Sequence, residues 1–196
     1  MTNKVIFWDF DGVIADTFEQ CYAISRLAYP EMSEREYREM FEGNINFTTS
    51  AKKPAQVVDF FAEFEKTILD APLTQGIAEV IEELSKDYAN VIISSTTTPL
   101  IDRYLTHHNL RHYFAEILGN DVAPSKVEKF KLGFEKHKTS SSHSVLITDT
   151  LGDMVEANEV GVSAIGVLWG FRDREELIEA GAETLVAQPQ ELLALL

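Results

Sequence analysis

The stretch Val5-Ile6-Phe7-Trp8-Asp9-Phe10-Asp11-Gly12-Val13 decides the fold. Its first four residues are apolar, mostly β-branched or aromatic, and predict a short buried strand that ends at Asp9. Asp9 and Asp11 are two residues apart, so in an extended chain their side chains project to the same side. Neighbouring carboxylates repel each other, and one pKa rises unless a cation lies between them. The stretch therefore predicts a ligand site at the carboxyl end of a strand, although Asp11-Gly12 is also a common turn sequence.

The composition predicts one globular domain, or one domain that carries a small insertion. The chain has 196 residues, of which 45% are hydrophobic and 25% are charged. A formal net charge of -15 disfavours nucleic acid and anionic membranes as partners. The single cysteine, Cys21, excludes an internal disulfide and favours a reducing, cytoplasmic location. We expect no signal peptide before the first strand, no membrane span and, because the five histidines form no motif, no zinc site.

From residue 72 onward, continuous apolar strands alternate with helical patterns. The expected strands cover 90–94, 115–118, 145–148 and 163–168, the expected helices cover 77–84, 98–105, 126–137, 151–160 and 175–180, and a last strand and helix share 184–196. Strands that are apolar throughout are typical of a parallel sheet that is covered by helices on both faces. The sequence therefore predicts an α/β fold.

The segment 16–71 shows only helical patterns. Two capping boxes are expected in it, Thr17 with Gln20 and Ser33 with Glu36. A third helix is expected to begin near Pro54, and its apolar stripe would contain Val57, Phe60, Phe61, Phe64 and Ile68. We therefore predict a core domain made of residues 1–15 and 72–196, and a small all-helical insertion made of residues 16–71.

Polar residues follow the strand expected at 90–94. The hydroxyl groups and backbone amides of Ser94 and Ser95, at the carboxyl end of a strand, can hold a phosphate oxygen. Serine is equally an ordinary residue of the turn that precedes a helix. The segment thus has a functional and a structural interpretation of similar weight.

Lys126 lies in the first turn of an expected helix, because Ser125 and Glu128 have the spacing of a capping box. A lysine there is repelled by the positive end of the helix dipole. The arrangement becomes favourable only if an anion binds at the helix terminus, where the lysine and the backbone amides can both contact it. Lys126 is therefore a candidate phosphate ligand. Lys129 is the alternative and is expected to face solvent.

Two more carboxylates follow the strand expected at 145–148. Asp149 comes directly after it and would lie level with Asp9 if the two strands are neighbours. Asp153 has a structural explanation, because it has capping-box spacing from Thr150. Two or three carboxylates that leave positions open for water are typical of a magnesium site.

The order and spacing of these four groups resemble the four motifs of the haloacid dehalogenase superfamily, subfamily I. The chain resembles its helical-cap, phosphoglycolate-phosphatase-like members over essentially the whole length, and the segments 72–76 and 167–171 also look like theirs. The resemblance implies a Rossmann-like doubly wound parallel sheet with a small helical cap. Two positions depart from the family pattern, because Thr148 stands where glycine is frequent and Val127 stands where proline is frequent.

The resemblance also implies a role for each candidate residue. Asp9 would be the nucleophile, Asp11 the general acid and base, and Ser94, Ser95 and Lys126 the phosphate-binding residues. Mg²⁺ would be bound by Asp9, by the backbone carbonyl of Asp11, by Asp149 and, directly or through water, by Asp153. The second acid at Asp11 argues against dehalogenation, because halide leaves without a proton whereas an alkoxide needs one.

The expected function is therefore that of a Mg²⁺-dependent phosphatase, which hydrolyses a small organic phosphate monoester through an aspartyl phosphate. Two alternatives stay open, a phosphomutase of the same superfamily and a non-enzymatic receiver or phosphate-binding domain. The expected partner is a small phosphorylated metabolite, and the expected state is a monomer or a small homo-oligomer. Polar candidates for substrate contacts in the insertion are Asn44, Asn46, Lys52 and Lys53.

Overall fold

A single parallel sheet forms the centre of the computed structural model, which describes residues 4–41, 54–172, 174–179, 182 and 184–196. Its strands are β1 (Val5–Trp8), β2 (Ala89–Ile93), β3 (Phe114–Leu118), β4 (Ser144–Thr148), β5 (Ser163–Val167) and β6 (Thr184–Val186). They lie in the order β3-β2-β1-β4-β5-β6, and every neighbouring pair is parallel. The predicted α/β fold with a doubly wound parallel sheet is confirmed. Asn44, Asn46, Lys52 and Lys53 lie outside the described residues.

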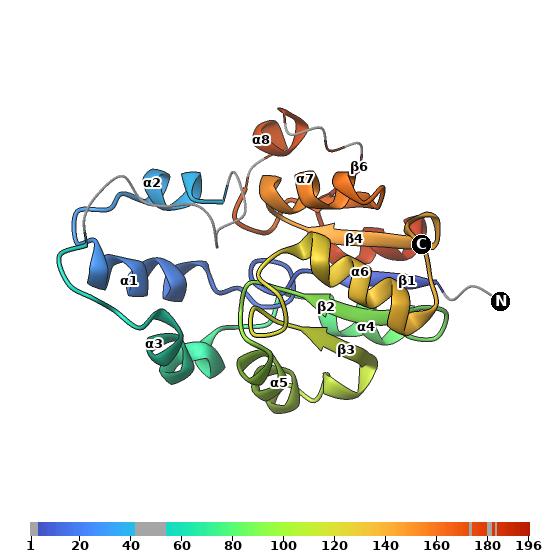
Figure 1. Cartoon of the computed structure of the whole chain (residues 1–196), viewed down its shortest axis with the longest axis horizontal. Coiled ribbons are helices and arrows are strands. Elements are labelled where there is room, and N and C mark those ends of the chain that lie inside the picture. Colours follow the sequence, from blue (N-terminus) through green and yellow to red (C-terminus); the bar gives the residue numbers. More distant parts are fainter. Residues whose placement is uncertain (1–3, 42–53, 173, 180–181, 183) are drawn as a thin grey trace.

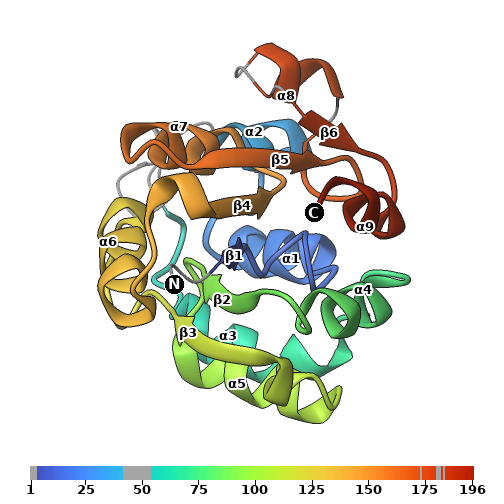
Figure 2. The ribbon, with the colours of Figure 1, turned by 90° about the vertical axis from the view of Figure 1, so that its right-hand side faces the viewer.

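Helices cover both faces of the sheet (Figure 2). One face is packed by α6 (Lys126–His137) and α7 (Leu151–Glu159), and the other by α4 (Ile77–Leu84), α5 (Thr98–His107) and α9 (Leu192–Leu195). Side chains of β1 alternate between the two layers: Phe7 packs edge-on against Phe130 of α6, with ring centroids 4.9 Å apart, whereas Trp8 joins the opposite layer. The remaining core helix is α8 (Arg174–Glu179), and short 3-10 turns are η1 (Ile68–Asp70), η2 (Arg111–Tyr113), η3 (Ser141–His143) and η4 (Pro189–Glu191).

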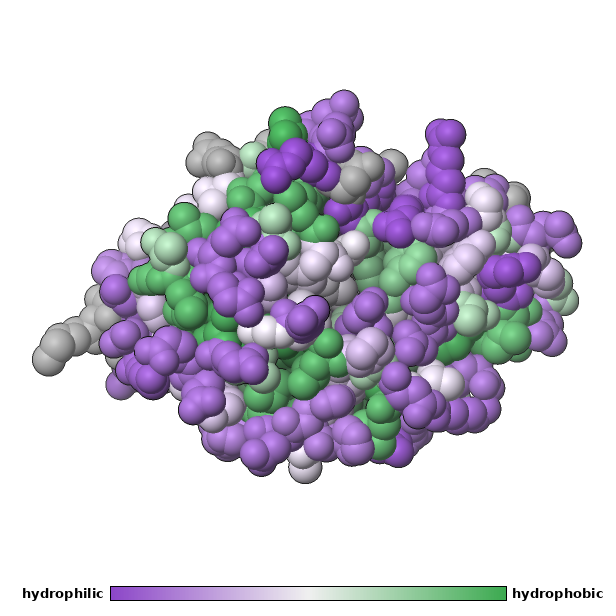
Figure 3. Space-filling view, turned by 180° about the vertical axis from the view of Figure 1, so that it is seen from behind, coloured by the Kyte–Doolittle hydropathy of each residue, from purple (hydrophilic) through white to green (hydrophobic). Residues whose placement is uncertain are grey.

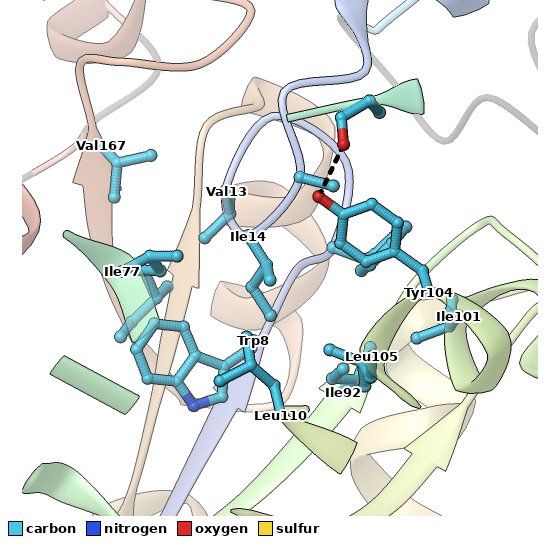
Figure 4. Packing of buried hydrophobic residues seen from close by; sticks show 14 of the residues in the cluster. Trp8, Val13, Ile14, Ile77, Ile92, Ile101, Tyr104, Leu105, Leu110 and Val167 are labelled. Atoms are coloured by element: carbon cyan, nitrogen blue, oxygen red, sulfur yellow. Dashed lines mark hydrogen bonds between the residues drawn. The ribbon is translucent and has the colours of Figure 1, made fainter. Parts of the chain in front are cut away.

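Trp8 is the largest fully buried side chain and lies among residues from several elements (Figure 4). Its indole Nε1–H donates to Asn90 Oδ1 at 2.9 Å, which satisfies the one polar atom of a ring that is otherwise surrounded by apolar groups. Ile14, from the loop that follows β1, belongs to the same cluster. The segment that carries Asp9 and Asp11 is therefore anchored on both sides, by Trp8 before it and Ile14 after it, in the same hydrophobic cluster.

Three helices lie at one end of the molecule, beyond the carboxyl ends of the strands (Figure 1). They are α1 (Phe18–Ala28), α2 (Glu34–Glu39) and α3 (Phe60–Thr67). The chain enters and leaves this region through two adjacent connections, because Asp16 N–H donates to Pro72 O at 2.9 Å and Thr74 N–H donates to Ile14 O at 3.0 Å. The division into a core domain and a helical domain of residues 16–71 stays a prediction.

The capping box of Ser33 and Glu36 is confirmed: each side chain accepts a hydrogen bond from the other residue's backbone N–H. The expected start of the third helix near Pro54 is wrong, because α3 begins at Phe60. Its N-cap is Asp59, whose Oδ1 accepts from Ala62 N–H at 3.1 Å. The segment before α3 is not helical, and it donates hydrogen bonds to backbone carbonyls at the end of α1. Ala55 N–H donates to Ala28 O at 2.7 Å, and Val57 is 98% exposed.

The face opposite to that of Figure 1 is largely hydrophilic, with small hydrophobic patches (Figure 3). This agrees with the excess of acidic residues in the sequence. Among the helices that the structure describes, none has the length and apolar character needed to cross a membrane.

Candidate active site

The candidate residues meet at the carboxyl ends of β1 and β4, where the strand order reverses direction. In doubly wound sheets, ligands bind in the crevice at this switch point. Asp9 continues β1 and its N–H donates to Ile147 O of β4 at 2.9 Å. Asp149 directly follows β4 and is fully buried. The register pairs Trp8 with Ile147, so Asp9 comes level with Thr148 and Asp149 lies one residue further along the neighbouring strand, close enough for its charge to act on Asp9.

Lys126 lies between two carboxylates. Its Nζ is 2.9 Å from Asp9 Oδ1, and it also forms an ion pair with Asp153 Oδ2. Burial disfavours its charge, but Asp153 and Asp9 together raise the pKa of Lys126 above its usual value. Burial raises the pKa of Asp9 well above its ordinary value, and Lys126 opposes this effect. A fixed cation at the end of β1 is therefore part of the site.

The first turn of α6 positions Lys126. Ser125 is the N-cap, and its Oγ accepts from Val127 N–H at 3.1 Å. The carboxylate of Glu156 on α7 accepts both from Ser125 Oγ at 2.8 Å and from Lys126 N–H at 3.1 Å. Glu156 thereby accepts hydrogen bonds at the start of α6, which is the role that capping-box spacing had suggested for Glu128.

Lys129 does not face solvent, and this prediction is wrong. Its side chain is fully buried, and Nζ donates to the backbone carbonyl of Ser94 at 2.6 Å. Burial, together with repulsion from Lys126, lowers the pKa of Lys129 to about 8. Of the two lysines, Lys126 is the one that contacts the candidate carboxylates and lines the cavity described below.

Asp11 is held by two threonine hydroxyls. Thr17 Oγ1 donates to Asp11 Oδ1 at 2.8 Å, and Thr96 Oγ1 donates to Asp11 Oδ2 at 2.7 Å. Burial raises the pKa of Asp11, and the two hydroxyls oppose the shift. The predicted capping box of Thr17 with Gln20 is therefore wrong, because Thr17 makes no side-chain cap and uses its hydroxyl on Asp11.

Ser94 and Ser95 follow β2 and line the same cavity. Ser94 is fully buried, and its Oγ accepts from Thr96 N–H at 3.0 Å. The turn thus has the structural role that the sequence allowed for, and it also presents both serines toward Asp9 and Asp11. Whether they bind phosphate stays a prediction.

Asp153 does not cap α7, so its predicted capping box with Thr150 is wrong. Its Oδ2 instead accepts from Thr148 Oγ1 at 2.6 Å and pairs with Lys126. Burial opposes ionisation, but Lys126 leads the contacts that lower the pKa of Asp153 below its ordinary value. Thr148, which stands where the family often has glycine, therefore contributes a hydrogen bond to this network.

Asp149 is the residue most suited to hold a cation. Its Oδ2 accepts from Phe171 N–H at 2.6 Å, whereas its buried Oδ1 has no hydrogen-bond partner among the described residues. The carboxylate is enclosed closely, since a Cβ at Gly12 (φ +76°) or at Gly170 would collide with it. Burial raises the pKa of Asp149 to about 7. An unpaired, desolvated carboxylate oxygen calls for a positive ligand.

The donor set fits Mg²⁺. It consists of oxygen atoms only, from Asp9, from Asp149 and from the chain at Asp11, and Mg²⁺ prefers a few carboxylates together with water and phosphate oxygens. Among the described residues, no group of three or more His, Cys, Asp or Glu side chains is arranged to hold a metal ion by itself. An ion at this place would need the Asp11 carbonyl, water and phosphate oxygens to complete its coordination.

A cavity of about 290 Å³ opens over these residues. Its floor contains Asp9, Asp11, Ser94, Ser95, Thr96, Lys126 and Asp153, and its opposite wall comes from the helical region 16–71 and from Phe171. Sequence reasoning missed Thr17, Thr96, Glu156 and Phe171. Glu156 follows Asp153 by three residues on a helix, so helical spacing alone could have placed it on the same face.

Comparisons with known proteins agree with this geometry. A family model described as haloacid dehalogenase-like hydrolase matches residues 5–167. The phosphoglycolate phosphatase of Synechococcus elongatus is 24% identical over 202 residues, which cover 97% of this chain and 95% of that protein. That of Vibrio parahaemolyticus is 22% identical over 218 residues and covers 97% and 94%. A haloacid dehalogenase-like family hydrolase from Streptococcus pneumoniae superposes with a TM-score of 0.79 at 22% identity over 98% of both chains.

Proposed function

Because the chain belongs to the haloacid dehalogenase-like hydrolase family, we propose that it is a Mg²⁺-dependent phosphatase that transfers the phosphoryl group of a small organic monoester to Asp9 and then to water. The observation that carries the proposal is the position of Lys126, 2.9 Å from Asp9 and paired with Asp153 at the floor of the cavity. The curated relatives named phosphoglycolate phosphatases support a small phosphorylated metabolite as the substrate.

In the first step, an Asp9 carboxylate oxygen forms a bond to phosphorus as the bond from phosphorus to the ester oxygen breaks. Asp11, whose pKa is raised by burial, gives its proton to the departing alkoxide. Lys126 and the serines after β2 stabilise the charge on the equatorial phosphate oxygens. The alcohol leaves, and Asp9 carries the phosphoryl group.

In the second step, Asp11 as a carboxylate takes a proton from water, and the water oxygen attacks phosphorus. The bond between phosphorus and Asp9 breaks, which releases inorganic phosphate and regenerates Asp9. The two threonines on Asp11 hold its carboxyl group in one orientation during both transfers.

Asp9, the backbone carbonyl of Asp11 and Asp149 would hold Mg²⁺, with Asp153 as a direct or water-mediated partner. When bound, the ion supplies positive charge that neutralises the phosphate oxygens and keeps Asp9 ionised. The unpaired Oδ1 of Asp149 supports this placement.

Residues 16–71 would act as a cap that closes over the phosphate, attached to the core by the paired connections at 14–16 and 72–74. The buried Cys21, which is free, suits a reducing compartment such as the cytoplasm.

The test is phosphate release from p-nitrophenyl phosphate and from a panel of phosphorylated metabolites, with Mg²⁺. We expect turnover by the parent protein and none by Asp9→Asn, because an amide is not a nucleophile. Asp16→Asn is the matched control, since Asp16 is an exposed carboxylate outside the site. Absence of turnover on every monoester would overturn the proposal, and formation of a phosphate isomer without release would indicate a mutase.

A further inference from the structure

The cavity wall that faces Asp9 is apolar and mostly aromatic. It is formed by Tyr37, Met40, Phe41, Phe60 and Phe61 of the helical region, together with Phe171 of the core. Tyr37 and Phe41 pack edge-on at 5.2 Å between centroids, and Phe41 packs edge-on against Phe171 at 5.3 Å. These contacts join Tyr37, Phe41 and Phe171 into one apolar surface, and Cys21 and Ser25 also line this side of the cavity, where the alcohol part of a bound phosphate ester would lie.

The charges of the cavity are unfavourable to a second anion. Lys126 is the one Lys or Arg among the described lining residues; it is already held between Asp9 and Asp153, and both Lys126 and the Mg²⁺ proposed above would be engaged by the phosphoryl group. Asp11 and Glu156 add further carboxylates to the lining. A carboxylate on the leaving group would therefore lose its hydration and gain no cationic partner from the described lining.

Arg38 is the cation of the helical region closest in sequence to this wall, and its guanidinium has other partners. It donates to the carbonyl of Phe171, forms an ion pair with Glu34 at 2.8 Å and stacks over the Phe18 ring at 4.1 Å. Arg38 thus fixes α2 to the core and does not supply a carboxylate site.

We propose that the leaving group of the substrate is an uncharged alcohol with an apolar or aromatic body, and not a hydroxy acid such as glycolate. The proposal rests on the phosphatase function proposed above and adds the class of alcohol. Tyr37, Met40 and Phe41 would be the residues that determine this specificity, because they form the wall opposite the reacting carboxylates.

The first experiment compares kcat/KM for three esters in Mg²⁺: phosphoglycolate, its uncharged amide and benzyl phosphate. The acid and its amide have nearly the same size, so the comparison isolates the charge. We expect the amide to exceed the acid by at least about tenfold, as for a buried charge that lacks a partner, and benzyl phosphate to exceed both. A kcat/KM for phosphoglycolate equal to or above that of its amide would overturn the inference.

The second experiment adds the missing cation. Met40 ends α2 at a half-buried position, and lysine has a similar length and is favoured at a helix C-terminus. We expect Met40→Lys to raise kcat/KM for phosphoglycolate by at least about fivefold and to lower that for benzyl phosphate. Leu27→Lys is the control for added charge, because Leu27 is 44% exposed and lies outside the lining. This variant should leave kcat/KM unchanged for both phosphoglycolate and benzyl phosphate.

Failure of the inference and failure of the function are distinguishable. If p-nitrophenyl phosphate is hydrolysed but Met40→Lys leaves the ratio of acid to amide at the parent value, the assignment of the wall is wrong and the phosphatase stands. If no monoester is hydrolysed, the proposed function falls and the inference falls with it.

Discussion

Asp9 and Asp11 are two residues apart, yet the fold gives their carboxylates different partners. Asp9 lies against Lys126 and interacts with the charge of Asp149, whereas Asp11 accepts from two neutral hydroxyls, of Thr17 and Thr96. Burial raises the pKa of both carboxyls; Lys126 opposes the rise at Asp9 and the two hydroxyls oppose it at Asp11, so the cation proposed beside Asp9 and Asp149 is what would keep Asp9 ionised while Asp11 holds its proton. Such a difference suits one carboxylate to attack and the other to transfer protons.

Asp11→Asn tests this division. We expect hydrolysis of alkyl phosphates to fall by at least about a hundredfold, because the departing alkoxide loses its proton donor. p-Nitrophenolate leaves without protonation, so Asp9 should still be phosphorylated by that ester, and the phosphoenzyme should accumulate for want of a base. The measurement is a single-turnover burst together with a phosphate mass on the peptide that contains Asp9. Parent rates on alkyl phosphates would remove Asp11 from the mechanism.

Lys129 gives a pH dependence of stability that can be isolated. Its pKa is lowered to about 8 by burial and by Lys126, whereas an unfolded lysine has a pKa of about 10.4. Between these values the unfolded chain binds more protons than the native one, so the contribution of this group to stability rises with pH. Relative to Lys129→Met, the parent free energy of unfolding should increase by about 2 kcal/mol from pH 8 to pH 10.

Urea denaturation at several pH values measures the difference between the two proteins. Lys138→Met is the matched control, because it removes a lysine from the exposed C-cap of the same helix. A parent-minus-variant difference that stays flat across the window would show that Lys129 titrates near its ordinary pKa.

At the scale of elements, the sequence predicted what depends on local pattern. Continuous apolar runs gave the strands, and the limits of α6 were predicted as the structure has them. The predictions that failed concern side chains whose partners lie outside their own helix. Thr17, Asp153 and Lys129 each had a local interpretation, and each bonds to another segment of the site instead. Spacing along one helix carries no information about partners that tertiary packing supplies.

The connection that leaves the helical region also depends on such a distant partner. Tyr104 of α5 is fully buried, and its hydroxyl donates to Ala71 O at 3.1 Å (Figure 4). We expect Tyr104→Phe to lower the free energy of unfolding by about 1–2 kcal/mol, because it leaves a buried carbonyl without a donor. Urea denaturation checks this. Tyr29→Phe, at a half-buried ring for which the described residues show no side-chain hydrogen bond, should cost less than about 0.5 kcal/mol.

At the scale of the whole molecule, the net charge of -15 complicates any measurement of metal binding. An acidic surface attracts every divalent cation weakly, and salt screens this attraction. The proposed site differs because it depends on the buried Asp149, whose Oδ1 has no other partner among the described residues. Specific binding should therefore persist at an ionic strength that removes the surface contribution.

We expect Mg²⁺ at about 100 times its Kd to stabilise the native protein by about 2.7 kcal/mol, which for a chain of this size raises Tm by about 5–10 °C. Thermal unfolding at constant ionic strength measures the shift without reference to catalysis. Asp149→Asn should abolish it, because an amide oxygen binds Mg²⁺ poorly. Asp87→Asn, which removes the same charge far from the site, should retain it. An equal Mg²⁺ shift in both variants would mean that the ion binds only to the acidic surface, and the magnesium assignment would then be wrong.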